Sequence, residues 1–137
     1  RFLLLSLAAL FALSALSSAE MQNVTVKGIA ICRERRLADI VVQLVEHDPF
    51  FMNNDLLTEV TTNKEGEFEV TGEVDQLGSM KPFVRFFHQC VLTKEQKKEG
   101  CNRRVDFEVP KKYINGPVYD MSYVPLKMKY KYEKIKC

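Results

Sequence analysis

Residues 57–71 read Leu57-Thr-Glu-Val-Thr-Thr-Asn-Lys-Glu-Gly-Glu-Phe-Glu-Val-Thr71, and this stretch indicates the fold class. From Glu67 to Thr71 polar and apolar side chains alternate strictly, which places Phe68 and Val70 on one face of a strand. Asn63–Gly66 has the composition of a tight turn, in which the glycine supplies a positive φ. The pattern predicts two strands, 57–62 and 67–71, joined as a β-hairpin.

Similar strand patterns recur at short intervals along the chain. We expect five further strands, at residues 23–32, 40–47, 82–90, 102–109 and 121–132. Residues 91–100 are rich in Lys and Glu, which is typical of a loop or a helical turn. Seven strands with almost no helix pattern predict a single all-β domain, a β-sandwich of two mostly antiparallel sheets.

The first residues indicate the compartment. Arg1 precedes an uncharged apolar run, 2–16, and Ser17-Ser18-Ala19 offers the small residues that a signal peptidase reads. We interpret residues 1–19 as a secretory signal peptide and residues 20–137 as the domain, which makes the protein secreted and extracellular. The alternative is a membrane anchor, but a span needs about 20 apolar residues and this run is shorter.

The four cysteines are an even number in a short chain that is expected to be secreted, so they predict two disulfides. They are Cys32, Cys90, Cys101 and Cys137. Four cysteines allow three connectivities. The chain has no close cysteine pair such as Cys-x-x-Cys, and His47 and His88 are not in the spacing of metal ligands, so we expect neither a metal nor another cofactor.

Two surface features are candidate sites. Asn23-Val24-Thr25 is an N-glycosylation sequon, whose alternative is an unmodified surface asparagine. Lys127, Lys129 and Lys131 alternate with apolar residues in the last expected strand and would form a row on one face. The row indicates either contact with an anionic membrane surface or the lysines that protect an edge strand from aggregation.

Charge and motifs argue against several functions. The net charge of +2 gives no reason to expect nucleic-acid binding, and the basic segments lack interleaved aromatic residues. The sequence has no Gly-x-Ser-x-Gly, no phosphate-binding glycine loop and no His-Glu-x-x-His. We therefore expect a binding protein and not an enzyme.

Ordered motifs along the chain resemble those of the nematode transthyretin-like family. They are Val26–Cys32, Asp55–Glu59, Thr62–Phe68, His88–Cys90, Cys101–Val105, Pro110–Ile114 and the closing Cys137. The resemblance implies a seven-stranded transthyretin-like sandwich and an extracellular binding or adaptor protein. One family member bridges phosphatidylserine on dying cells to a phagocyte receptor, so the implied partner is an anionic lipid or an extracellular receptor.

In a fold of this kind the first and last strands are neighbours, which favours a Cys32–Cys137 bond with Cys90–Cys101 closing the polar segment between them. Two other functions stay open. A transthyretin-like carrier would be an oligomer with a ligand channel between its subunits. Hydroxyisourate hydrolases share the fold but end in Tyr-Arg-Gly-Ser, whereas this chain ends in Tyr130–Cys137 without that motif. The oligomeric state is not predicted.

Overall fold

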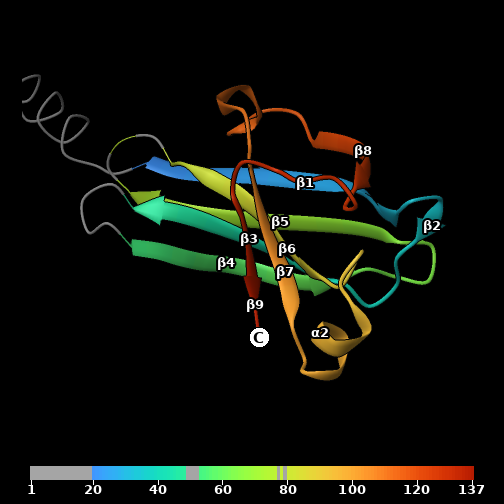
Figure 1. Cartoon of the computed structure of the whole chain (residues 1–137). Helices are drawn as coiled ribbons and strands as arrows, with labels where there is room; N and C mark the ends of the chain where they lie inside the picture. The colour runs from blue at the N-terminus through green and yellow to red at the C-terminus, as the bar shows by residue number, and fades with distance from the viewer. Residues whose placement is uncertain (1–19, 49–52, 77, 79) are drawn as a thin grey trace, which may run out of the picture.

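The computed structural model describes residues 20–48, 53–76, 78 and 80–137. Within these residues, nine strands form two sheets that pack face to face (Figure 1). The first sheet contains β2 (Arg35–Arg36), β1 (Glu20–Cys32), β5 (Glu67–Gln76) and β8 (Tyr119–Pro125). The second has the order β4 (Asn53–Thr61), β3 (Val41–Asp48), β6 (Pro82–His88), β7 (Asn102–Glu108), β9 (Glu133–Lys136). The predicted all-β sandwich is confirmed, with nine strands instead of seven. The proposed signal peptide, residues 1–19, lies outside the described part.

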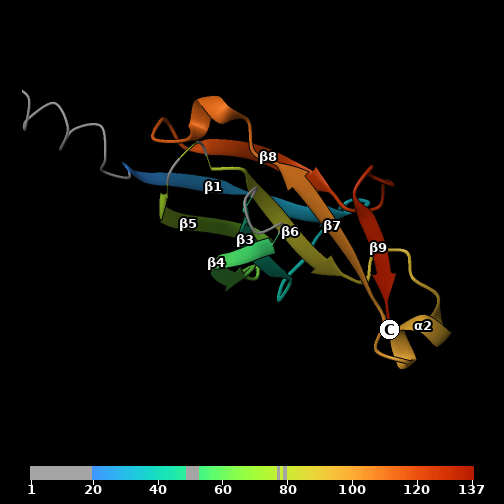
Figure 2. The same cartoon turned by 90° about the vertical axis from the view of Figure 1, so that its left-hand side faces the viewer.

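Most strand pairs are antiparallel, as predicted, and the exception is the parallel pairing of β1 with β8. Figure 2 shows these two strands side by side. The segment between β6 and β7 contains a short helix, α2 (Lys94–Lys98), and a 3₁₀ helix, η1 (Lys111–Tyr113), follows β7. In the described residues, neither helix has the length and hydropathy that a membrane span requires.

The predicted hairpin at Asn63–Gly66 is wrong, although the turn itself is present. The Asn63 side-chain oxygen accepts hydrogen bonds from the backbone N–H groups of Glu65 and Glu67, and Gly66 has φ +75°. However, β4 pairs with β3 while β5 pairs with β1, so the turn carries the chain from one sheet to the other. β5 buries Phe68 and Val70, and the partly buried Leu57 and Val60 of β4 pack against the same core from the other sheet.

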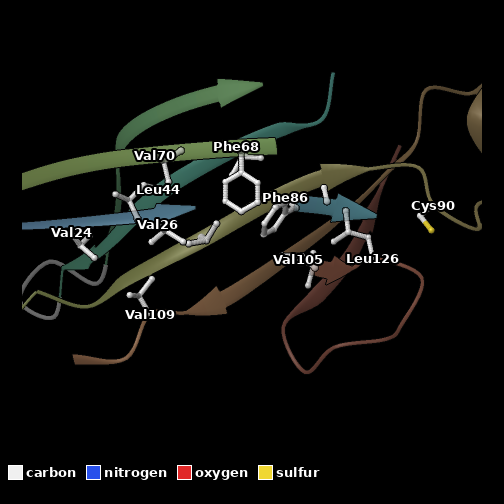
Figure 3. Close-up of a cluster of buried hydrophobic side chains, with 14 of the residues drawn as sticks. Val24, Val26, Leu44, Phe68, Val70, Phe86, Cys90, Val105, Val109 and Leu126 are labelled. Carbon is white, nitrogen blue, oxygen red and sulfur yellow. The ribbon is translucent and has the colours of Figure 1, made fainter. Parts of the chain in front are cut away.

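The core fills the space between the sheets with aliphatic and aromatic side chains (Figure 3). Phe68 and Val70 are buried there, as the alternation predicted. Phe68 meets Phe86 edge to face at 5.2 Å between ring centroids, and Phe107 continues the contact at 5.6 Å from Phe86. Burying side chains of this size stabilises the fold by about 1.5–3 kcal/mol each.

The last predicted strand, 121–132, is also wrong, because β8 ends at Pro125 and β9 begins only at Glu133. Leu126 is buried and its N–H donates to the Ile31 carbonyl, which turns the chain inward. The Tyr130 hydroxyl then donates to the Pro125 carbonyl at 2.6 Å and closes a loop. The chain crosses between the sheets here, so the three lysines lie in a loop and not on the face of a strand.

The predicted disulfide pairing is wrong as well, since the bonds are Cys32–Cys90 and Cys101–Cys137. The prediction placed the last strand beside β1, but β9 pairs with β7 and sets Asn102 opposite Lys136. The next position along this ladder brings Cys101 to Cys137. Cys32, at the end of β1, meets Cys90 just after β6, so that this bond connects the two sheets.

Candidate functional site

Residues 126–132 form a loop with exposed basic and apolar side chains, which we call the lysine loop. All three predicted lysines, Lys127, Lys129 and Lys131, are exposed. Two large apolar side chains accompany them, Met128 at 57% exposure and Tyr132 at 46%. The Lys131 ammonium lies 5.2 Å from the centroid of the Tyr132 ring. The loop therefore presents positive charge and apolar surface together.

A buried arginine, Arg103 of β7, holds the backbone of this loop. Arg103 is only 4% exposed. The guanidinium donates to the carbonyls of Leu126 and Met128, both at 2.9 Å, and to the Cys90 carbonyl at 3.0 Å. It also forms an ion pair with Glu133, whose carboxylate accepts a hydrogen bond from the Tyr130 N–H at 3.2 Å. The loop is thus fixed from inside while its lysines stay in water.

Sequence reasoning missed Arg103, although the pattern contained a signal. In the expected strand 102–109, Val105 and Val109 alternate with charged residues, and residue 103 falls on the same face as these two valines. An arginine at an inward position requires buried acceptors, because an unpaired charge in a core costs several kcal/mol. Here Glu133 and the loop carbonyls supply those acceptors.

His88 lies beside this arginine and is 2% exposed. Its Nδ1 accepts a hydrogen bond from the Cys90 N–H at 3.1 Å, and within the described residues Nε2 has no hydrogen-bond partner. Burial, with a smaller contribution from the Arg103 charge, lowers the pKa of His88 from 6.5 to about 4, although Glu133 acts in the opposite direction. The imidazole is therefore neutral at physiological pH.

Asn23, the predicted glycosylation site, is exposed on β1. Its backbone N–H donates to the side-chain oxygen of Asn115 at 2.9 Å, and the Asn115 N–H donates to the Asn23 carbonyl at 2.8 Å. These bonds use the backbone of Asn23 and leave its amide side chain at the surface. Glycosylation stays a prediction.

Three grooves on the described surface differ in charge. One, of about 410 Å³, lies on the second sheet, where Arg85 donates to both carboxylate oxygens of Asp106 at 2.8 and 3.0 Å. Another, of about 600 Å³, contains Lys27 with three carboxylates, those of Glu67, Glu69 and Asp120. The largest, of about 1510 Å³, lies at the end of the sandwich where Cys32 is bonded to Cys90, and we call it the end groove.

One cluster has the residue types of a metal site. Glu99, Cys101 and Cys137 place potential ligand atoms within 4.8 Å of one another. Both sulfur atoms are bonded to each other in a disulfide, so neither is the thiolate that a metal ion would need. The arrangement supports a structural bond and not a metal site.

The fold and its bonds define a disulfide-linked β-sandwich domain with a basic loop. The model of the transthyretin-like family matches residues 27–110, which is more than half of the chain, and the chain belongs to this family. Transthyretin-like protein 16 of Caenorhabditis elegans is 42% identical over 120 residues, covering 88% of this chain and 86% of the relative. Transthyretin-like protein 33 of the same nematode is 31% identical over 112 residues, covering 80% and 76%. The predicted family is confirmed.

Proposed function

We propose that this chain is a secreted, non-enzymatic adaptor that binds an anionic membrane surface through the lysine loop. The observation that carries the proposal is the combination of three exposed lysines with Met128 and Tyr132 on a backbone held by Arg103. A loop that is already ordered loses little conformational entropy on binding, which favours affinity.

The expected strength of this contact fits a reversible adaptor. Each lysine near an anionic leaflet contributes about 1 kcal/mol, so the three together give about 3 kcal/mol at physiological salt. Met128 and Tyr132 add apolar contact at the level of the lipid headgroups, where amphipathic side chains are favoured. Binding of this kind responds to salt and to lipid composition.

Two features support an extracellular location. Disulfides persist in oxidising compartments and are rare in the cytosol, and this chain forms two of them. The uncharged run after Arg1 has the composition of a secretory signal. Detection of the protein in the medium of an expressing eukaryotic cell, with residues 1–19 removed, tests this part of the proposal.

Vesicle co-sedimentation tests the membrane contact. The disulfide-bonded protein, purified from a secretory host, is mixed with phosphatidylcholine vesicles with and without phosphatidylserine. We expect selective sedimentation with phosphatidylserine that weakens above about 150 mM salt, because the Debye length there is only about 8 Å. No binding to either vesicle would contradict the proposal and direct the search to a protein receptor.

Charge reversal assigns the contact to the loop. The variant K127E/K129E/K131E is expected to lose sedimentation with phosphatidylserine vesicles. The matched control is K64E/K81E/K111E, which changes the net charge equally at three other exposed lysines. Equal loss in both variants would show an effect of bulk charge and would reject the lysine loop as the site.

A further inference from the structure

The end groove has two walls that come from different sheets. One wall consists of residues 32–35 and 37–41, which run from the end of β1 to the start of β3. The other consists of residues 87–93, which begin at the end of β6 and continue after it. Lys97 of α2, Asn102 and Lys127 complete the lining. Figures 1 and 2 show α2 projecting beyond the end of β6. The Cys32–Cys90 bond joins the two walls, so the groove keeps its shape.

The end groove has a larger excess of positive over negative side chains than either of the other two grooves. Its cations are Arg33, Arg35, Lys97 and Lys127, and its carboxylates are Glu34 and Asp39. Among the described residues the ion pairs involve Arg85, Arg103 and Arg104, so none of the four groove cations is neutralised in this way. In the groove on the second sheet, by contrast, Arg85 is already paired with Asp106.

A buried donor lies along the same groove. Because Nδ1 of His88 accepts the Cys90 N–H, the hydrogen of the neutral imidazole is on Nε2. Nε2 donates to no acceptor within the described residues. Buried polar atoms are nearly always paired in native proteins, so this donor needs a partner that the described residues do not supply.

The placement of the cations indicates the class of anion. They come from three separate segments around a groove of about 1510 Å³, namely residues 33–35, α2 and the lysine loop, which suits a linear chain that carries repeated charges. Among the described residues, the groove is lined by a single Phe, Phe87, and by no Tyr or Trp. This leaves little aromatic surface on which successive nucleobases would stack. Hydroxyl and amide groups from Thr93, Gln89 and Asn102 suit the many hydroxyl groups of a sugar chain.

We propose that the end groove binds a linear sulfated polysaccharide through Arg33, Arg35, Lys97 and Lys127. This site and this ligand are distinct from the membrane contact of the lysine loop, although Lys127 borders both. A chain that engages four cations releases bound counterions, so its affinity falls about 50-fold between about 50 and 200 mM salt.

A heparin oligosaccharide is the probe for this proposal, titrated against the disulfide-bonded protein. The variant R33E/R35E/K97E is expected to lose at least about tenfold in affinity, while K64E/K81E/K111E, with the same change in net charge, stays within about twofold of the unchanged protein. All six positions are exposed, and an unchanged unfolding midpoint in urea confirms that each variant is folded. Full affinity in the groove variant would overturn the proposal.

Two further probes separate this ligand from other anions. Desulfated heparin is expected to bind at least about tenfold more weakly, and a single-stranded oligonucleotide of equal charge is expected to bind more weakly than the sulfated chain. Equal binding of the oligonucleotide would show a general polyanion surface and would overturn the assignment to sulfated sugars. Binding that does not depend on sulfation would do the same.

A pair of variants distinguishes failure of this inference from failure of the adaptor proposal. K129E/K131E is expected to lose vesicle binding and keep heparin binding, because neither lysine lines the groove. R33E/R35E/K97E is expected to lose heparin binding and keep vesicle binding. Loss of heparin binding in K129E/K131E, with retention in the groove variant, would place the polysaccharide on the lysine loop and reject the groove.

Discussion

His88 lies directly opposite Arg103 in the antiparallel pairing of β6 with β7, and both side chains are buried. The arginine forms an ion pair with Glu133 and donates hydrogen bonds to the loop carbonyls. The histidine, with a positive neighbour and no carboxylate bonded to it in the described residues, stays neutral. The residue pair therefore couples the stability of the fold to pH at the position where the lysine loop is held.

Stability is expected to fall as the pH drops from about 6.5 to 4. The pKa of His88 is about 4 in the folded protein and 6.5 in an unperturbed histidine. In this window the unfolded chain therefore takes up a proton that the folded protein does not. The loss amounts to up to about 3 kcal/mol of unfolding free energy, and urea denaturation at several pH values measures it.

The variant His88→Gln isolates this effect, because a glutamine does not titrate. Its own stability will differ, but its dependence on pH between 6.5 and 4 is expected to be flatter than that of the unchanged protein. An identical slope in both proteins would show that other groups cause the acid sensitivity.

Arg103→Ala is expected to destabilise the protein by about 3–5 kcal/mol, because it leaves Glu133 and several buried carbonyls without their donor. The lysine loop should then become accessible to trypsin. Cleavage after Lys127 and Lys129 is measured by mass spectrometry, with cleavage in α2 as an internal reference. If the variant keeps the unfolding midpoint of the unchanged protein and its loop stays protected from trypsin, Arg103 does not hold the loop.

Peptide mapping without reduction is expected to find Cys32 with Cys90 and Cys101 with Cys137. The loops that these bonds close span 58 and 36 residues. In the chain-entropy model each bond stabilises the fold by about 4 kcal/mol. Replacing both members of either pair with alanine should lower the unfolding free energy by a similar amount. A Cys90–Cys101 peptide in the native protein would contradict the pairing.

Asn23 is expected to carry a glycan when the protein is made in a eukaryotic secretory host. Its side chain is exposed, and the hydrogen bonds to Asn115 use only its backbone. Peptide N-glycosidase F should lower the apparent mass, and Asn23→Gln should abolish that change. A single unshifted band for the unchanged protein would show that the sequon is not used.

Most strand positions were predictable because alternation is a local property, and the predicted strand at 121–132 is the exception. Phe68 and Val70 are buried where the period of two placed them. The assignment of strands to sheets was not predictable in this way. The Asn63–Gly66 turn is compatible with a hairpin or with a crossing between sheets, and only the packing of both apolar faces decides between them.

The candidate site was predictable in its residues but not in its structure. Lys127, Lys129 and Lys131 are exposed as expected, yet the alternation around them reflects a loop held by Arg103 and not a strand. The pairing of the cysteines failed for the same reason, because it assumed that the last strand lies beside the first. The end groove joins residues about 60–90 positions apart, which local patterns do not reveal.

The order of the disulfides along the chain has a consequence for biosynthesis. Both cysteines of the Cys32–Cys90 bond precede Cys101 in the sequence. The two disulfide loops therefore follow one another along the chain and are not nested. In the proposed secretory route, the first bond can close in the oxidising lumen while the C-terminal third of the chain is still on the ribosome. Consecutive pairing of this kind can form without reshuffling by an isomerase, because each cysteine meets its partner before the next pair is made.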